Sequence, residues 1–395
     1  MTPPREVDTL VIGGGLVGLS LAYGLARAGE RVRVLDEGDN AFRAARGNFG
    51  LVWVQGKGLD WPDYARWTMA AARAWPGFAA ELTGRTGIDV ELRQPGGLTL
   101  CLSADELTER AAGLLRLRQQ LGGTYPFEVL TPAQVQTLLP QAGPAVAGAL
   151  WCPLDGHVSP LRLLRALVQG LAEMGGELSA GAPVQQLEHR GGQFRVTVVG
   201  ARTGKSTGKG TGTGMDGGTG VAPTTHTAAK LVLAAGLGNR ALAPLIGLQA
   251  PVQPNRGQIL VSERIQPFLS HPTMQVRQTA DGVVQIGDSK EDVGLDDGTT
   301  LDQLSRIAQR ATRCFPLLSQ VNVVRTWGAL RVMTADGYPI YQASSACPGG
   351  FVVTCHSGIT LAAQHAGALV DWIRGGAEPA EIVGFKAERF DVPAH

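Results

Sequence analysis

The first forty residues alternate apolar runs with glycine and charged positions in the pattern of a βαβ unit. Residues 9–12 form an apolar run typical of a strand buried in a parallel sheet, and the run ends at the glycine-rich segment 13–18. The next apolar stretch predicts a helix over 16–28, which Gly29 can end because a residue without Cβ adopts the left-handed cap conformation. Residues 31–35 then supply a second, parallel strand.

Further along the chain, the hydrophobic pattern changes several times between helical and strand periodicity. Helical spacing predicts helices over 64–83, 104–121, 161–174, 300–313 and 358–373. Alternating or continuous apolar runs predict strands within 90–102, 148–152, 185–199, 230–238 and 258–286, and segment 177–184 should return to the parallel sheet. The pattern predicts an α/β fold with a second region built on antiparallel strands.

The segment 204–220 differs from both patterns. It contains eight glycines in seventeen positions and almost no apolar residues. Such a composition cannot bury enough apolar surface to order itself, so we predict a flexible insertion at a hairpin tip, without a chemical role.

Length and charge limit the class of protein. The chain has 395 residues with 35 basic and 34 acidic side chains, and no basic block stands out. At roughly 150 residues per domain, this length predicts two or three domains. The balanced charge argues against nucleic acid as a partner and favours small-molecule ligands. Five cysteines without CxxC or another metal-ligand spacing predict no metal site and a cytoplasmic location.

The uncharged stretch 9–26 raises the alternative of a signal peptide or membrane-spanning segment. A signal peptide has a basic start and a small-residue cleavage site, and a spanning helix needs about 20 apolar residues without clustered glycines. The glycines within 13–18 therefore favour the βαβ interpretation.

The glycines at the first strand-to-helix turn fit the GxGxxG pattern. Gly13 allows the tight turn, Gly15 lets the backbone approach a pyrophosphate, and Gly18 lets the helix pack closely against the strand. The phosphates would lie at the helix N-terminus, where free N–H groups favour negative charge. Asp36 and Glu37 follow the second strand, where a carboxylate accepts hydrogen bonds from a ribose. These features predict a dinucleotide site.

Two later segments could complete such a site. Arg43, Arg46 and Asn48 lie among glycines and suit a loop that crosses the phosphates and reaches the cofactor's ring system, with an ordinary solvated loop as the alternative. The strand 230–238 ends in glycines, including Gly236, and is a second place where a nucleotide could lie against bare backbone.

The last predicted helix begins beside a histidine. Ser357 is a plausible N-cap for the helix over 358–373, whose dipole could stabilise negative charge on a bound ring. His356 precedes this helix, so it is a candidate for contact with the cofactor ring or with a substrate amine. A structural histidine is the alternative.

In these motifs, the chain resembles the FAD-dependent group that includes D-amino-acid oxidase, glycine oxidase and sarcosine oxidase. The likeness rests on GGGLVG with Asp36 and Glu37, on TWGALR followed by ADGYPIY, and on CHSGITLAAQHAGALV near the C-terminus. The stretch GNFGLVWVQGKG together with TCHSGITLAA looks most like the β-type subunits of D-hydroxyproline dehydrogenases, opine oxidases and hydrogen cyanide synthase.

The resemblance implies a Rossmann-like FAD-binding domain, discontinuous over 1–88, 150–246 and 325–395, and an antiparallel-sheet α+β substrate domain over 89–149 and 247–324. It implies that Arg331 holds the substrate carboxylate. By position it also implies a larger set of FAD contacts: Leu16, Val17, Asp36, Glu37, Ala45, Arg46, Gly50, Leu51, Val184, Thr354, Cys355, His356, Ser357, Gly358, Ile359 and Thr360.

Three departures from the family pattern change the expected chemistry. The flavin-linking cysteine of monomeric sarcosine oxidases is absent after Arg331, so the FAD should be non-covalent. Gln285 stands where those oxidases carry a lysine associated with oxygen reactivity, and Gln275 where glycine oxidase has a tyrosine. The electron acceptor could thus be oxygen, a quinone or a partner subunit in a hetero- or homo-oligomer. Lys57 is a further candidate for flavin contact.

The implied reaction moves a hydride from the carbon bearing a neutral amine to flavin N5 and gives an imine. The substrate could be a D-amino acid, a proline-like imino acid, sarcosine or glycine, or an opine. Two alternatives stay open at this point. One is an NAD-dependent dehydrogenase with the same glycine motif, and the other is a flavin-holding subunit for assembly or electron relay in a larger complex.

Overall fold

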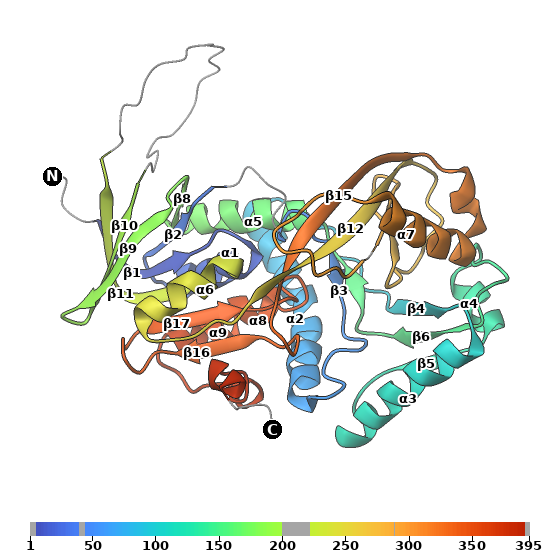
Figure 1. The fold of residues 1–395 in the computed structure, drawn as a ribbon, viewed down its shortest axis with the longest axis horizontal. Helices are drawn as coiled ribbons and strands as arrows, with labels where there is room; N and C mark the ends of the chain where they lie inside the picture. Colours follow the sequence, from blue (N-terminus) through green and yellow to red (C-terminus); the bar gives the residue numbers. More distant parts are fainter. Residues whose placement is uncertain (1–4, 39–43, 200–221, 288, 392–395) are drawn as a thin grey trace, which may run out of the picture.

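The chain folds into a helix-covered mixed sheet and a second region of antiparallel strands (Figure 1). The computed structural model describes residues 5–38, 44–199, 222–287 and 289–391. Arg43 and the predicted insertion 204–220 lie outside these ranges. The strand orders of the sheets confirm the expected α/β fold class, with a Rossmann-like sheet beside an antiparallel α+β region.

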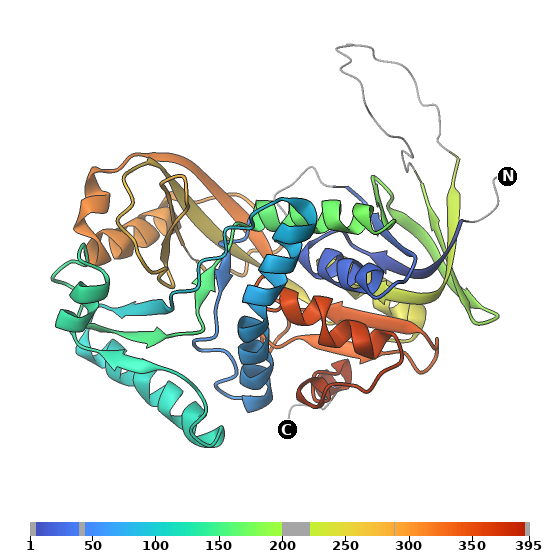
Figure 2. The same ribbon diagram turned by 180° about the vertical axis from the view of Figure 1, so that it is seen from behind.

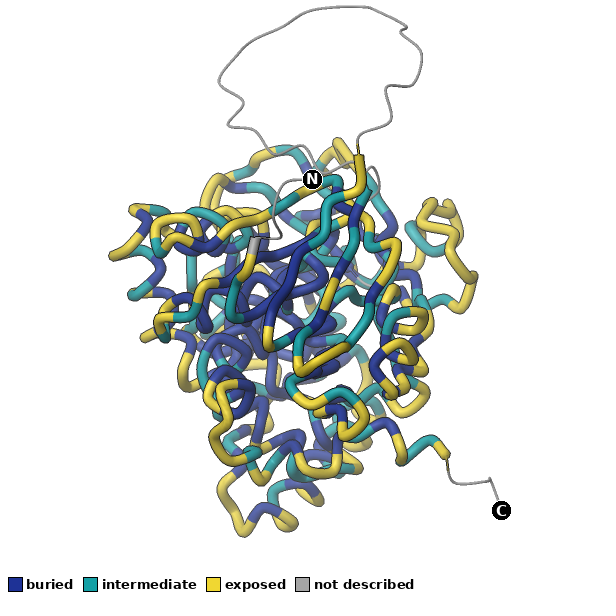
Figure 3. The backbone as a smooth tube through the Cα atoms, turned by 90° about the vertical axis from the view of Figure 1, so that its left-hand side faces the viewer, coloured by how far each residue is buried: buried dark blue, intermediate teal, exposed yellow. Residues whose placement is uncertain are grey.

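The first sheet is built around β1 (Arg5–Ile12), which pairs in parallel with its neighbours on both sides. Its strand order is β16-β17-β11-β1-β2-β8, and the flanking strands are β2 (Val32–Asp36), β8 (Glu177–Ala180), β11 (Thr224–Leu233), β17 (Gly350–Thr354) and β16 (Ile340–Ala343). Most residues of β1, β2 and β11 are buried, because both faces of the sheet are covered. Figure 3 shows buried backbone through this sheet and exposed backbone at its rim.

Helices cover one face of this sheet (Figure 2). Helix α1 (Leu16–Arg27) packs between α5 (Pro160–Glu173) and α8 (Ala362–Ala366). A Cβ on Gly24 would lie 2.3 Å from the Ala366 carbonyl oxygen, so only glycine permits this helix crossing. Two more helices extend this layer: α2 (Pro62–Thr86) and α9 (Ala368–Ile373).

The opposite face packs against a hairpin and a short 3₁₀ helix. The hairpin is formed by β9 (Val184–Arg190) and β10 (Gln193–Val198), and β10 extends the sheet beside β11. The helix η2 (Ala243–Ile246) follows η1 (Gly236–Gly238) and α6 (Asn239–Leu242). The apolar side chains of these elements form a second core with the sheet.

The second region contains two antiparallel sheets that share one apolar core. The larger has the order β13-β14-β12-β15, with bounds Val276–Gln278, Val283–Ile286, Gln253–Arg264 and Val323–Met333. The smaller has the order β4-β6-β5, with bounds Gly97–Cys101, Gly148–Cys152 and Glu128–Leu130. The helices of this region are α3 (Ala104–Gln120), α4 (Pro132–Leu138) and α7 (Leu301–Cys314).

The two regions meet where the larger antiparallel sheet lies over the first part of the chain. A Cβ on Gly47 would lie 2.4 Å from the Ala329 side chain, and the Trp327 indole N–H donates to the Gly47 carbonyl at 3.2 Å. A two-stranded ribbon, β3 (Leu51–Val52) with β7 (Gly156–His157), follows directly. The candidate site lies at this seam.

One predicted element differs from the structure. The expected C-terminal helix over 358–373 begins only at Ala362, because residues 358–361 form a turn, and it breaks at Gly367, where φ is −114° and ψ is −101°. Ser357 does not cap this helix through its side chain, because its hydroxyl oxygen accepts hydrogen bonds from Lys57 and Tyr64.

The proposed domain limits stay a prediction. Those near residues 88 and 246 coincide with the ends of α2 and η2, whereas those near 150 and 325 fall within β6 and β15. Within the described ranges, no helix has the length and apolar character needed to cross a membrane.

Candidate active site

Glycine fits the three motif positions for different structural reasons. Gly13 adopts φ +112°, and a Cβ there would lie 2.4 Å from the Ala234 carbonyl oxygen. A Cβ on Gly18 would lie 1.9 Å from the Gly13 carbonyl oxygen, so the start of α1 can approach β1 only with glycine at this position. A Cβ on Gly15 would meet nothing closer than Ala45 at 3.9 Å. Gly13 and Gly18 thus allow close backbone packing, and Gly15 leaves space beside the helix N-terminus.

The acidic end of β2 lies beside these glycines. The Asp36 carboxylate accepts hydrogen bonds from the Gly14 N–H at 2.6 Å and from the Gly38 N–H at 2.9 Å. Asp36 is half-buried, whereas Glu37 is exposed. Asp36 is therefore the better placed of the two for a ribose.

The loop after β2 returns the chain to the glycine motif. Ala45 faces Gly15, and Asn48 Oδ1 accepts the Gly50 N–H at 2.7 Å. Gly50 adopts φ +91°, and a Cβ there would lie 2.5 Å from the Val158 carbonyl oxygen. Asn48 thus shapes the turn that leads into Leu51. Arg46 is exposed, which suits contact with a cofactor's phosphates.

The segment after β17 lies against the start of α1. A Cβ on Gly358 would be in ordinary contact with Val17 at 3.5 Å and Leu16 at 3.7 Å. Thr360 Oγ1 accepts the Trp53 N–H at 3.1 Å, which joins this segment to the first loop. The Trp75 indole N–H donates to the carbonyl oxygen of Ile359 at 3.2 Å.

The remaining predicted cofactor residues lie at the ends of strands of the first sheet. Gly236, with φ +59°, follows β11. Val184 begins β9, two residues after Ala182, whose N–H donates to the Asp36 carbonyl at 2.8 Å. Thr354 ends β17, and its buried hydroxyl has no partner among the described residues.

The residues therefore fit a dinucleotide. The N-cap of α1 makes no side-chain hydrogen bond, so the first N–H groups of the helix are available to phosphate. Open space at Gly15, the carboxylate of Asp36 and the orphaned hydroxyl of Thr354 all lie along the ends of the strands of this sheet. Ligands of open α/β sheets bind at such ends.

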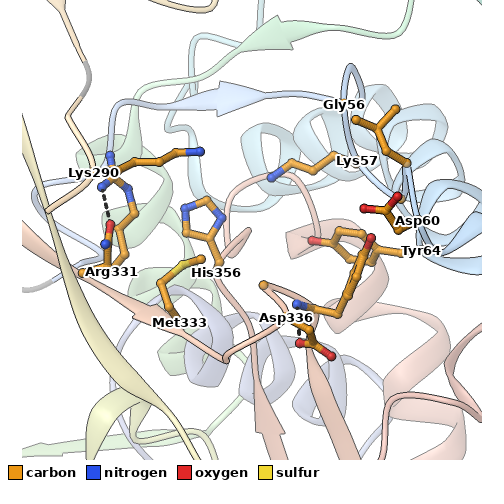
Figure 4. Close-up of a pocket in the computed structure, with 14 residues that line it drawn as sticks. Gly56, Lys57, Asp60, Tyr64, Lys290, Arg331, Met333, Asp336 and His356 are labelled. Carbon is orange, nitrogen blue, oxygen red and sulfur yellow. Dashed lines mark hydrogen bonds between the residues drawn. The ribbon is translucent and has the colours of Figure 1, made fainter. Parts of the chain in front are cut away.

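A pocket of about 290 Å³ lies in the seam between the two regions (Figure 4). This volume is near the lower end of the roughly 300–1,000 Å³ that is typical of small-molecule sites. Its lining is Gly56, Lys57, Gly58, Leu59, Asp60, Tyr64, Asn255, Lys290, Arg331, Met333, Asp336, Gly337, Tyr338 and His356. Arg331, predicted to hold the substrate carboxylate, and His356, predicted to contact the cofactor ring or the amine, both line this pocket.

Arg331 projects into this pocket from β15. Its Nη1 donates to Asn255 Oδ1 at 3.2 Å, and the two residues are cross-strand partners in the β12–β15 pair. A Cβ on Gly257 would lie 2.2 Å from Arg331 Nη2, so the guanidinium in this position lies over the space that glycine leaves open. The strand pair thus fixes the orientation of the planar fork.

Lys57 reaches the pocket from the opposite wall. Its Nζ donates to Ser357 Oγ at 2.6 Å, and the Tyr64 hydroxyl donates to the same oxygen at 3.0 Å. Desolvation lowers the pKa of Lys57 to about 8. Figure 4 shows the amino groups of Lys57 and Lys290 pointing toward one another across the pocket.

His356 lies between these basic groups. Desolvation, and then the positive charges of Lys57, Arg331 and Lys290, hold the pKa of its imidazole well below the usual range. His356 is therefore neutral at physiological pH. Its Nδ1 lies 3.5 Å from Ser357 Oγ.

The negative groups of the pocket are partly neutralised by other contacts. Asp336 pairs with Arg389 at 2.7 Å and accepts the Tyr338 N–H at 3.0 Å. Asp60 is exposed. The described part of the chain contains no group of three or more His, Cys, Asp or Glu side chains that could hold a metal ion.

Sequence reasoning missed several residues of the pocket. Asn255, Lys290 and Met333 come from β12, from the segment after β14 and from β15, and a one-dimensional pattern does not show that these segments meet. One signal was present: lysine is rare in this chain, yet two of its few lysines line the same pocket.

Comparisons with known proteins find similarity over nearly the whole chain. A sequence model of the family described as "FAD dependent oxidoreductase" matches residues 8–372. The chain is 42% identical over 386 residues to an opine oxidase subunit from Agrobacterium tumefaciens (strain Ach5), covering 98% of both chains. It is 40% identical over 387 residues to an opine oxidase subunit from Rhizobium meliloti, again covering 98% of both.

Its fold is similar to the crystal structure of glycine oxidase from Geobacillus kaustophilus, with a TM-score of 0.82. That match covers 97% of this chain and 98% of the other at 22% identity, so it supports the fold alone.

Proposed function

The chain belongs to the FAD-dependent oxidoreductase family, and on this premise we propose that it oxidises a secondary amine with a carboxylate on each side of the nitrogen. Family membership makes it a flavoenzyme that acts on the C–N bond of an amine or amino acid, and it sets aside the NAD-dependent alternative. The narrower substrate class, an N-carboxyalkyl amino acid of the opine type, and a non-covalent FAD are the proposal.

One observation carries this proposal. Three cationic side chains, Arg331, Lys57 and Lys290, line the same pocket of about 290 Å³. A monocarboxylate needs one of them. A substrate with two carboxylates can use the guanidinium for one and the facing ammonium groups for the other, so that each carboxylate has a charge-assisted partner.

The residues then take distinct roles. The planar fork of Arg331, held by Asn255, binds the carboxylate next to the carbon that is oxidised. Lys57 and the exposed Lys290 hold the second carboxylate near the pocket mouth. Neutral His356 can accept a hydrogen bond from the amine N–H.

The glycine motif, Asp36 and the segment 354–360 would hold the cofactor. The chemistry that bound FAD supplies is acceptance of a hydride from the carbon next to nitrogen, which turns the C–N single bond into an imine. Positioning contributes most of the remaining catalysis, since a fixed near-attack geometry replaces a bimolecular encounter.

A matched pair of amines tests the substrate class. An N-(carboxyethyl) amino acid and its N-propyl analogue differ mainly by the second carboxylate. Anaerobic loss of flavin absorbance should be faster by at least tenfold for the dicarboxylate at subsaturating concentration, because a charged contact is worth roughly 1.5–3 kcal/mol. Lys290→Met should reduce this preference and leave the rate with the N-propyl analogue nearly unchanged.

Equal rates for the two amines, in an enzyme that retains FAD, would contradict the dicarboxylate class while leaving amine oxidation intact. Absence of bleaching with either amine but rapid bleaching with a D-amino acid would assign the pocket to a primary amine instead.

A second proposal concerns assembly. The two relatives at 42% and 40% identity are both named as subunits, and each is matched over 98% of its length. This supports a role for the chain as one subunit of a larger oxidoreductase, where a partner receives electrons. Co-expression with neighbouring genes and size measurement of the purified complex test it.

A further inference from the structure

A buried arginine outside the pocket, Arg277, forms no ion pair with any residue that the structure describes. Arg277 lies in the middle of β13 and is 2% exposed. Two other arginines, Arg33 and Arg256, are also 2% exposed. Arg33 pairs with Glu177 at 2.7 Å, and Arg256 pairs with Glu291 at 2.8 Å. Among the described residues, no carboxylate contacts Arg277.

Among the described ranges, the hydrogen-bond partners of Arg277 are neutral groups. Its Nε donates to Gln285 Oε1 at 2.9 Å, and its Nη1 donates to the Val158 carbonyl at 3.2 Å. Nη1 also lies 3.1 Å from His157 Nδ1, and desolvation followed by the charge of Arg277 lowers the pKa of His157 to about 3, so this imidazole is neutral. Within the described part of the chain, Nη2 contacts no acceptor.

The carboxylates that act on Arg277 from a distance are engaged elsewhere. Glu91 pairs with Arg162 at 3.0 Å, and Asp281 pairs with Arg264 at 3.4 Å. A buried cation without an anion is costly, because the protein interior does not replace its hydration. The arrangement is stable if a bound ligand supplies negative charge or electron-rich atoms.

Arg277 lies beside the loop that is predicted to contact the flavin. Its guanidinium carbon lies 3.1 Å from where a Cβ on Gly50 would be, and 6.0 Å from the centre of the Phe49 ring. Gly50 and Leu51 belong to the loop predicted to contact the flavin. Arg277 and Gln285 are cross-strand partners and project from one face of the sheet, while Val276 and Val284 of the other face are buried in the core with α7.

We propose that Arg277 faces the bound flavin and stabilises the negative charge that FAD gains on reduction, and that it thereby raises the midpoint potential of the cofactor. Its bond to Gln285 also fixes the side chain that stands at the position linked to oxygen reactivity in the resembling oxidases. This inference rests on FAD binding, which the family carries, and not on the identity of the amine.

Two measurements on the FAD-loaded protein test the inference without any substrate. Sulfite is a small anion that adds to flavins more tightly when a positive charge lies nearby, and its binding is followed by loss of flavin absorbance. Arg277→Met should weaken sulfite binding by at least tenfold and lower the midpoint potential by about 30 mV or more, the equivalent of tenfold for a two-electron couple. Arg277→Lys keeps the positive charge and should retain most of the sulfite affinity and most of the midpoint potential.

A matched control removes one positive charge at an exposed position on α7. Arg306 has a side chain that is 70% exposed and pairs with exposed Asp302, so Arg306→Met should change neither property. If Arg277→Met fails to fold, Arg277→Gln, which keeps an amide donor for the Val158 carbonyl, carries the same expectation. Wild-type potential and sulfite affinity in either folded, FAD-loaded neutral variant would overturn the inference.

Discussion

At the scale of single residues, Arg331 has the clearest expected role. Its guanidinium lies over Gly257 and is held by Asn255, so both its plane and its direction are set before a substrate arrives. Arg331→Ala should reduce kcat/KM by an amount equivalent to roughly 2–5 kcal/mol, because the substrate carboxylate would lose its charged partner. Arg331→Lys should recover little, since a point charge cannot reproduce the bidentate fork.

Steady-state kinetics with FAD content measured in each variant checks this expectation. Asn255→Ala serves as a companion variant, because it removes one hydrogen bond of the guanidinium but keeps the charge, and it should give a smaller loss. An unchanged kcat/KM in FAD-loaded Arg331→Ala would show that the carboxylate is held elsewhere.

Lys57 should give the dicarboxylate preference a pH dependence. Desolvation lowers its pKa to about 8, and only the protonated ammonium attracts a carboxylate. As pH rises through about 8, the ammonium loses its proton, so the ratio of kcat/KM for the dicarboxylate to that for the N-propyl analogue should fall. Deprotonation of the substrate amine affects both compounds alike and cancels in the ratio.

Measurement of this ratio from pH 6 to pH 10 tests the assignment, and Lys57→Met should make the ratio smaller and flat with pH. A ratio in the wild type that stays constant or rises above pH 8 would exclude Lys57 as a ligand of the second carboxylate.

The cysteines bear on how the cofactor is attached. Val332 and Met333 follow Arg331 where the resembling sarcosine oxidases carry the flavin-linking cysteine. The nearby Cys355 is half-buried, and desolvation raises the pKa of its thiol to about 12, so it does not form a reactive thiolate. Acid precipitation should therefore release all yellow colour into the supernatant, and colour retained in the washed pellet would indicate a covalent link.

At the scale of elements, local signals in the sequence carried most of the fold. The βαβ unit, the helix α5 and the β9–β10 hairpin lie within a few residues of their predicted limits, because glycines and charged positions mark their ends. The C-terminal helix was predicted as continuous because its apolar spacing is continuous. The break at Gly367 separates α8, which packs against α1 and α2, from α9, and the sequence does not display these contacts.

The helix crossing at Gly24 links this packing to the cofactor site. A Cβ there would lie 2.3 Å from the Ala366 carbonyl oxygen and 2.7 Å from a Val370 methyl group. Gly24→Ala should lower the free energy of unfolding by about 1–3 kcal/mol through overpacking. Because α8 follows the segment that rests on Leu16 and Val17, FAD should also dissociate more readily.

Gly77 in α2 provides the matched control. No heavy atom lies within 4 Å of the position of its Cβ, so Gly77→Ala should stabilise the protein by up to about 1 kcal/mol through helix propensity. Thermal unfolding and fluorescence of released FAD measure both effects. Equal stability of the two variants would show that the α1–α8 contact adjusts without cost.

At the scale of the whole molecule, the site is assembled from segments that only the tertiary fold brings together. The first loop, the β12–β15 pair and the segment after β17 are separated by up to 300 residues in the chain, as the Lys57–Ser357 bond illustrates. The sequence predicted Arg331 and His356 because they resemble family motifs. Asn255, Lys290 and Arg277 carry no motif, so their roles follow only from the seam between the two sheets.

The same architecture bears on where the electrons go. Gln285 replaces the lysine that the resembling oxidases associate with oxygen reactivity, and its side-chain oxygen is bonded to Arg277. Two relatives are named as subunits. We therefore expect the isolated chain to pass electrons to a quinone-like dye at least tenfold faster than to oxygen.

The comparison is turnover with the dye under argon against peroxide formation in air, with the same amine. Arg331→Ala is the control, because it should lower both signals by the same factor if they arise from the substrate site rather than from released FAD. Peroxide formation as fast as dye reduction would identify the chain as an oxidase that needs no partner for its turnover.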